Sequence, residues 1–254
     1  MKFTKSIVRI INLAGIGGLI AVFGLYTAIK PSYVLPTMAE LQETDNISAF
    51  VGEKEQKAIK ISRQSAVQVI STSHSGKVAK LSGTYITHKE KYYVLTALHG
   101  IVGVCENVWI WTADGGYSEC VSILAIDKKS DYALMEINKL PDLIPVSVPR
   151  NMPRISEWKQ SLSIQTEVFY TGFPNSSNLL TIGGEIIGYS DRDKIYINSY
   201  AWSGSSGSGV FNKNGKLIGY IVAIDVGETE YGVEVLSQVV YVEPAFKVDW
   251  SSLF

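Results

Sequence analysis

Short strands recur along most of the chain, and this repetition constrains the fold more than any other feature of the sequence. From Ser65 onward, about a dozen segments rich in β-branched and aromatic residues follow one another at roughly 8–15 residue spacing. KYYVLTALHG, NVWIWTA and DYALMEI are examples. Almost no helical periodicity separates them. The pattern predicts an all-β protein, either a sandwich or a pair of barrels.

A Gly/Ser-rich run, AWSGSSGSGVF at residues 201–211, interrupts this pattern and resembles a flexible linker. Its flanks contradict that interpretation. KIYINSY precedes it, and GVFNKNGKLIGYIVAI follows, with a turn signal at Asn214-Gly215 between two apolar stretches. The run therefore joins strands of one sheet. Glycine permits the unusual backbone angles of a tight turn, so we expect a turn that exposes a serine.

The N-terminal part of the chain differs from the rest. Residues 10–29, IINLAGIGGLIAVFGLYTAI, carry no charge, and at about 1.5 Å per residue they just cross a hydrocarbon core of roughly 30 Å. Lys2, Lys5 and Arg9 precede this run. The positive charges predict a cytoplasmic N-terminus and a single-pass anchor, with the remainder on the extracytoplasmic side, periplasmic or extracellular.

The alternative for this segment is a cleaved signal peptide, which would make the protein secreted. A cut after Ala28 would place the bulky Tyr26 at the third position before it, where a small residue is preferred. A cut after Ala39, in TMA, fits better but lies far from the apolar run. The sequence therefore favours the anchor. We expect three parts: an anchor or signal sequence at 1–30, a stalk at 31–63 that includes a short helix around EKEQKAIK, and one folded domain at 64–254.

Composition excludes several function classes. The formal net charge of −1 argues against a nucleic-acid partner. Cys105 and Cys120 fit neither a zinc spacing nor a C-x-x-C redox motif. An exported domain permits a disulfide. However, the hairpin register around DGG predicts that Cys120 lies near Trp109 and not opposite Cys105, which favours free or loosely paired cysteines.

A serine on a tight turn is inert unless a base activates it. His99 is the candidate base because it directly ends the hydrophobic strand YYVLTALHG, whereas the other two histidines lie in polar, loop-like stretches. The base needs a carboxylate to fix its tautomer. Asp131 stands at the entrance of an apolar strand in KKSDYALMEI, while Asp127 lies in a charged, solvated turn. The order His99, Asp131, Ser206 is one of those known for nucleophilic triads.

TALHG, SDYALMEI and SGSSGSGVF together resemble the three signatures of the trypsin-like (chymotrypsin-fold) serine proteases. The bacterial HtrA/Deg-like and glutamyl-endopeptidase-like branch is the most similar. LSGTYI, YTGFP and GKLIGYIVAI resemble further blocks, so the similarity extends from Ser65 to Phe246. The resemblance implies two antiparallel six-stranded β-barrels with the active site in the cleft between them. The PDZ domain of many Deg proteases is not expected.

Carried over to this sequence, the resemblance implies a serine endopeptidase that acts on a protein or peptide through an acyl-enzyme. This mechanism needs no metal or other cofactor. Ser206 would be the nucleophile, His99 the general base and then acid, and Asp131 the residue that orients it. The backbone N–H groups of Gly204 and Ser206 would form the oxyanion hole. The primary substrate pocket would have its wall at Val222, Ala223 and Ile224 and its base near Tyr200.

The pocket positions contain no carboxylate to pair with Lys or Arg and no histidine to pair with Glu. A small or medium apolar residue is therefore expected before the cut. Two other functions are less consistent with the sequence. A catalytically silent homologue that binds peptides or partners is disfavoured because the triad residues are all present. An α/β-hydrolase esterase is disfavoured because Asp131 precedes the serine and a hairpin follows it.

Overall fold

The computed structural model of the protein describes residues 47–48, 51–176, 178–229 and 232–253. The predicted membrane anchor at 10–29 and much of the predicted stalk lie outside these residues. Within the described ranges, no helix is both long and apolar enough to cross a membrane.

The first half of the domain closes into a β-barrel. Its order is β1-β4-β5-β6-β3-β2, and the antiparallel pairing of β1 with β2 closes it. Within β4, buried and half-buried residues alternate, as the two-residue period of a strand requires. The strands are β1 (Ala66–Thr72), β2 (Val78–His88), β3 (Lys91–Ala97), β4 (Val108–Trp111), β5 (Tyr117–Asp127) and β6 (Tyr132–Ile137).

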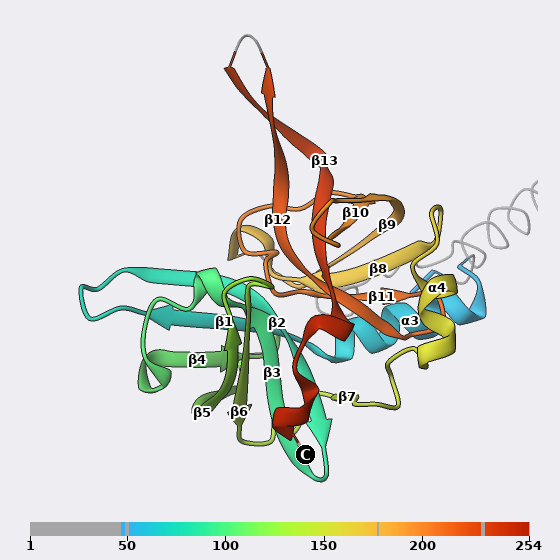
Figure 1. Ribbon diagram of the computed structural model, residues 1–254. Coiled ribbons are helices and arrows are strands. Elements are labelled where there is room, and N and C mark those ends of the chain that lie inside the picture. Colours follow the sequence, from blue (N-terminus) through green and yellow to red (C-terminus); the bar gives the residue numbers. More distant parts are fainter. Residues whose placement is uncertain (1–46, 49–50, 177, 230–231, 254) are drawn as a thin grey trace, which may run out of the picture. The chain divides into compact units, whose positions relative to one another are not determined.

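The second half forms another closed antiparallel barrel, in the order β10-β13-β12-β11-β8-β9. The prediction of two six-stranded barrels is therefore confirmed, and Figure 1 shows them next to each other. The strands are β8 (Glu167–Gly172), β9 (Leu180–Tyr189), β10 (Ile195–Asn198), β11 (Gly209–Asn212), β12 (Leu217–Thr229) and β13 (Gly232–Pro244).

Each barrel has its own apolar core, and a third cluster joins them. Leu95 and Leu134 of the first barrel are fully buried in one cluster with Phe211 and Tyr220 of the second. The C-terminal 3-10 turns, Ala245–Lys247 and Trp250–Leu253, add apolar residues to the same cluster. Burial of this seam fixes the two barrels against each other, as the cleft between them requires.

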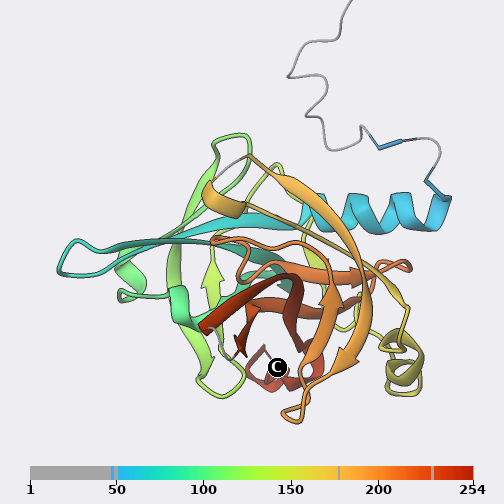
Figure 2. The same cartoon turned by 90° about the horizontal axis from the view of Figure 1, so that it is seen from above.

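The segment between the barrels carries β7 (Val146–Ser147), which pairs in parallel with β2, and the short helix α4 (Trp158–Ser161). A longer helix, α3 (Glu53–Gln64), occupies the end of the predicted stalk. It packs on the second barrel (Figure 2): Ser62 Oγ donates to Thr171 Oγ1 of β8 at 2.8 Å, and Ala58 is fully buried.

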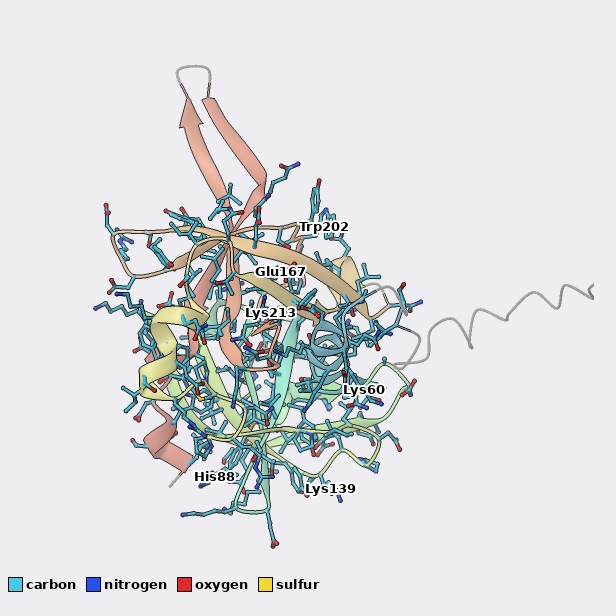
Figure 3. The ribbon with its side chains drawn as sticks, turned by 90° about the vertical axis from the view of Figure 1, so that its right-hand side faces the viewer. Lys60, His88, Lys139, Glu167, Trp202 and Lys213 are labelled. Atoms are coloured by element: carbon cyan, nitrogen blue, oxygen red, sulfur yellow. A yellow bond between two sulfur atoms is a disulfide. The ribbon has the colours of Figure 1, made fainter. Side chains whose placement is uncertain are left out.

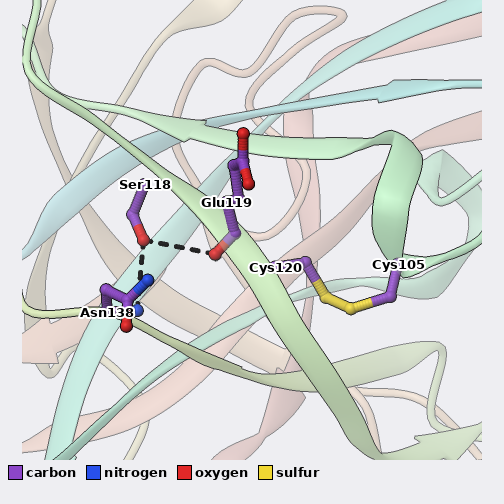
Figure 4. Close-up of a disulfide and its surroundings, with 5 residues drawn as sticks. All are labelled: Cys105, Ser118, Glu119, Cys120 and Asn138. Atoms are coloured by element: carbon purple, nitrogen blue, oxygen red, sulfur yellow. Dashed lines mark hydrogen bonds between the residues drawn. A yellow bond between two sulfur atoms is a disulfide. The ribbon is translucent and has the colours of Figure 1, made fainter.

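The expectation of free or loosely paired cysteines is wrong, because Cys105 and Cys120 form a disulfide with 5.3 Å between their Cα atoms (Figure 4). The hairpin register itself is close to the expected one, with Trp109 opposite Glu119. The difference lies before β4. There the chain makes a 3-10 turn, Cys105–Asn107, instead of continuing straight, and this turn returns Cys105 to the side of β5.

The hairpin of β12 and β13 extends past the second barrel. β12 pairs with β11 from Leu217 to Tyr220, and β13 pairs with β10 from Val239 to Val242. Further out, among the described residues, these two strands pair with each other alone. Figure 1 shows the outer part as a two-stranded arm that projects from the barrels.

Candidate active site

Two hydrogen bonds join His99 to Asp131, and a third joins Asp131 to the neighbouring Leu98. Strand β3 ends at Ala97, and a 3-10 turn (Leu98–Gly100) follows, which places His99 beside the start of β6. The His99 backbone N–H donates to Asp131 Oδ1 at 2.8 Å, and His99 Nδ1 lies 2.6 Å from Asp131 Oδ2. The Leu98 N–H donates to the Asp131 carbonyl at 3.0 Å. A carboxylate accepts only, so Nδ1 carries the proton and Nε2 is left as a base.

Asp131 raises the pKa of His99 through its hydrogen bond, and its negative charge acts in the same direction, while partial burial of the ring opposes the shift. The imidazole is half exposed, whereas the Asp131 side chain is 23% exposed. The carboxylate thus has two tasks that a triad needs: it fixes the tautomer and stabilises the imidazolium form.

The backbone at Asp131 is left-handed, with φ 52°, a conformation that Asp tolerates better than most residues. The second barrel supports this turn, because the Tyr220 hydroxyl donates to the Ser130 carbonyl at 2.6 Å. Burial raises the pKa of Tyr220 strongly, which keeps the phenol protonated as a donor. Asp127 accepts the N–H groups of Lys129 and Ser130 and so stabilises the turn, in keeping with its exclusion as the partner of His99.

The Gly/Ser run folds as two successive tight turns that share Ser205. The Ser205 N–H donates to the Trp202 carbonyl at 2.9 Å, with Gly204 at φ +94°. The Ser208 N–H then donates to the Ser205 carbonyl at 3.1 Å, with Gly207 at φ +88°. A positive φ at the third residue of a turn is the type II pattern, which favours glycine. This is the structural reason for the glycines of the run.

Both barrels hold Ser206 in place. Its carbonyl accepts the Ser82 N–H of β2 at 2.9 Å, and the next N–H, of Gly207, donates to the Ile221 carbonyl of β12 at 2.7 Å. The Ser206 hydroxyl lies 3.5 Å from the Val222 carbonyl. No hydrogen bond joins Ser206 to His99 within the described residues, but the two side chains line the same pocket.

The N–H groups of Gly204 and Ser206 have no acceptor among the described residues, whereas the Ser205 N–H between them is bonded. The Gly204 carbonyl is turned away and accepts the buried Ser82 Oγ at 2.7 Å. A Cβ at position 204 would lie 2.6 Å from the Phe173 carbonyl oxygen, so a side chain does not fit there. Two unpaired donors on one turn are suited to a negative oxygen.

The pocket around these groups measures about 550 Å³, and its lining includes His99, Trp202, Ser206, Val222 and Ala223. Of the residues expected to form the substrate pocket, Val222 and Ala223 line this cavity. The side chain of Ile224 is outside the described part of the structure.

The structure differs from the expectation at Tyr200, which does not line this pocket. Its half-exposed ring stacks on that of Trp202, with the centroids 6.1 Å apart. Trp202, which is labelled in Figure 3, lines the pocket instead of Tyr200.

Three residues of the site were missed by the sequence analysis: Ser82, Trp202 and Tyr220. Ser82 is fully buried in β2, where its side chain bonds Gly204 and accepts the Phe173 N–H at 2.8 Å. Its signal was a serine inside the apolar strand LSGTYI. Within the described residues, no group of three or more His, Cys, Asp or Glu side chains is placed to hold a metal ion.

The sequence model of the trypsin-like peptidase domain matches residues 81–219, more than half of the chain. No curated protein sequence matches. Among solved structures, a serine endoprotease from Yersinia pestis is similar at TM-score 0.56 and 20% identity, covering 76% of this chain and 63% of that one. A protease from M. tuberculosis in its active form gives 0.56 and 19%, over 75% and 80% of the two chains.

The HtrA-type protease AlgW, solved with a tripeptide, gives a TM-score of 0.57 at 17% identity over 74% of this chain and 59% of its own. This chain thus spans less than two thirds of two of these structures. At these sequence identities the structural similarity shows the fold, whereas the match to the sequence model shows the family. The chain belongs to the trypsin-like peptidase domain family.

Proposed function

We propose that this protein is a serine endopeptidase in which Ser206, His99 and Asp131 form the catalytic triad. The observation that carries the proposal is the bond of 2.6 Å from His99 Nδ1 to Asp131 Oδ2, beside a pocket that His99 and Ser206 both line. Nε2 is then free to accept a proton from the Ser206 hydroxyl. The 3.5 Å contact of that hydroxyl with the Val222 carbonyl is too long to oppose its rotation toward His99.

Hydrolysis proceeds in two steps. Ser206 Oγ attacks the scissile carbonyl while its proton passes to His99 Nε2, and the oxyanion accepts hydrogen bonds from the N–H groups of Gly204 and Ser206. The imidazolium then gives its proton to the leaving amine, and an acyl-enzyme remains. Water, deprotonated by His99, then attacks the acyl carbonyl. The ester bond to Ser206 Oγ breaks, Ser206 takes the proton back from His99, and the acid product leaves. Neither step requires a metal or another cofactor.

An apolar side chain is expected before the cut. Val222 is buried and Ala223 is small, and together they form the described part of the wall near Ser206. No carboxylate of the described residues lines the pocket to pair with a basic substrate side chain. A peptide library should therefore show cleavage after small or medium apolar residues, and strong selectivity for Arg or Lys would contradict this assignment.

We also propose that residues 10–29 anchor the protein in a membrane with the peptidase domain on the extracytoplasmic side. The uncharged run and the preceding basic residues support this topology. The disulfide supports an oxidising location for the domain. Carbonate washing should leave the protein in the membrane fraction, and a reporter fused after residue 254 should be active on the exported side. A soluble form that begins near residue 29 or 40 would instead indicate cleavage.

A fluorophosphonate probe tests the nucleophile. Ser206 is partly exposed in the pocket, whereas Ser205 and Ser208 are almost fully buried. The probe should label Ser206 alone. Ser206→Ala should abolish labelling and lower kcat by about 10⁶, while Ser205→Ala and Ser208→Ala, the matched controls, keep measurable turnover. Peptide binding without any labelling or cleavage by the wild type would indicate a catalytically silent homologue.

A further inference from the structure

The pocket at Ser206 carries an uneven distribution of charge. One wall consists of residues 77–81, from the β1–β2 turn and the start of β2, and we call it the cationic wall. Lys77 and Lys80 on this wall are both exposed, and neither forms an ion pair with a described residue. Among the residues whose side chains the structure describes, no Asp or Glu lines the pocket. Because the whole chain has a net charge of −1, this local excess of positive charge does not follow from composition.

The cationic wall and β12 lie on opposite sides of the nucleophile. The carbonyl of Ser206 and the N–H of Gly207 belong to one peptide unit, and in a trans peptide these groups point in opposite directions. The carbonyl accepts a hydrogen bond from the N–H of Ser82 in β2, and the N–H donates to the carbonyl of Ile221 in β12. The peptide that follows the nucleophile therefore lies between the two strands.

A bound substrate chain extends away from its reacting carbonyl in two directions. In the function proposed above, on which this inference rests, the residue before the cut faces Val222 and Ala223 of β12. The half after the cut must then pass along the opposite side, over β2. Lys80 is two residues from Ser82, or about 7 Å along an extended strand, so its long side chain can reach the first few residues after the cut.

We propose that Lys77 and Lys80 form a subsite for acidic side chains on the C-terminal side of the cut. Neither ammonium group has an ion-pair partner among the described residues, and a carboxylate bound there accepts their N–H groups without displacing one of these residues. The wall is exposed to solvent, so the attraction is moderate and screened by salt. The substrate class is thus a peptide with an apolar residue before the cut and Asp or Glu within three positions after it.

Binding to the full-length Ser206→Ala protein tests the subsite without relying on cleavage. Three fluorescein-labelled peptides share one valine before the cut and carry Glu, Gln or Lys at the second and third positions after it. At low salt, the Glu peptide should bind about 3- to 10-fold more tightly than the Gln peptide, and the Lys peptide should bind most weakly. Raising the salt to several hundred millimolar should reduce this difference.

Charge reversal supplies the decisive comparison. Lys77→Glu/Lys80→Glu in the same background should invert the order of the Glu and Lys peptides, and the single variants Lys77→Gln and Lys80→Gln should each reduce the preference in part. Lys139→Glu is the matched control. Lys139 is exposed, does not line the pocket, and is labelled in Figure 3 at the opposite end of the view from Trp202. This variant should keep the wild-type order.

Equal affinity for the Glu and Gln peptides, or an unchanged order in the reversed variant, would overturn the subsite. A preference for Glu placed before the cut would overturn its assignment to the leaving half. Failure of the proposed function has a different signature: the chain with Ser206 intact cleaves none of the peptides. In that case the affinities still decide whether the cationic wall selects acidic chains.

Discussion

Asp131 is the residue whose removal should change both the rate and its pH dependence. His99 acts as a base only when neutral, and Asp131 raises its pKa, so activity in the wild type rises with pH through a midpoint above that of an unpaired histidine. Asp131→Asn removes the charge and lowers the His99 pKa. The midpoint of kcat/KM should therefore move to lower pH, while the maximal rate falls by about 10⁴ because the tautomer is no longer fixed.

Asp127→Asn is the control for this change. It removes a similar charge from the same loop, but Asp127 accepts the N–H groups of Lys129 and Ser130 and makes no described contact with His99. Its pH profile should keep the wild-type midpoint. A midpoint that is equally unchanged in Asp131→Asn would exclude the carboxylate as the partner of the catalytic base.

Gly204 allows a sharp test of the oxyanion hole. Alanine at this position must adopt φ +94° and would bring Cβ within 2.6 Å of the Phe173 carbonyl oxygen, so the turn must shift and its N–H must move. We expect Gly204→Ala to lower kcat by about 10²–10³. Gly115→Ala is matched in backbone angle, with φ +87°, but has no atom within 4 Å of the added Cβ, and its kcat should be unchanged.

At the scale of elements, helix α3 acts as part of the second barrel. Lys57 and Ala58 are neighbours on it, yet Lys57 is exposed and Ala58 is completely buried. Ala58→Asp buries an unpaired carboxylate against the barrel, while Lys57→Asp introduces the same residue on the solvent side. Thermal unfolding of the full chain should show Tm lower by roughly 5–10 °C for Ala58→Asp and almost unchanged for Lys57→Asp. Equal Tm values would mean that α3 does not contribute to the stability of the domain.

The elements that sequence analysis predicted best are those whose pattern is local. Alternation along the strands and the Asn214-Gly215 turn required no knowledge of the partner strand. The docking of α3 was not predicted, because a helix of charged residues has the composition of a solvated stalk, and its contacts with β8 are 109 residues away in sequence. The hydrogen bond between Ser62 and Thr171 produces no periodic pattern in the sequence.

The same distinction between local sequence patterns and distant contacts applies to the candidate site. His99, Asp131 and Ser206 could be located from short motifs, each with its own strand or turn. Tyr200 and Trp202 could not be distinguished, because the segment before the turn is irregular and alternation does not decide which ring reaches the pocket. The disulfide was missed because a single 3-10 turn at Cys105–Asn107 changes the direction of the chain.

At the scale of the whole molecule, two barrels contribute one half each to the site. His99 and Asp131 come from the first barrel and Ser206 from the second, while hydrogen bonds cross the seam at Ser82 to Gly204 and at Tyr220 to Ser130. The geometry of the proposed triad therefore depends on the relative position of the barrels, which the shared apolar cluster fixes. Substitutions that weaken this apolar cluster should reduce activity even when both barrels remain folded.

The disulfide allows a test of the membrane topology proposed above. Cys105 and Cys120 are the two cysteines of the chain, and the bridge closes a loop with a sequence separation of 15 residues. A loop of this length contributes about 3 kcal/mol to stability in the chain-entropy account. Cytoplasmic thiols remain reduced, so the bridge should form only after export.

The full-length chain, isolated from membranes without reductant, should therefore resist maleimide labelling until it is reduced. The chain that begins at residue 31 and stays in the cytoplasm should be labelled at both cysteines and should unfold at lower temperature. Cys105→Ser/Cys120→Ser is the control: it should not be labelled on either side and should match the reduced protein in Tm. Labelling of both cysteines in the untreated full-length chain would place the domain on the reducing side and contradict the proposed topology.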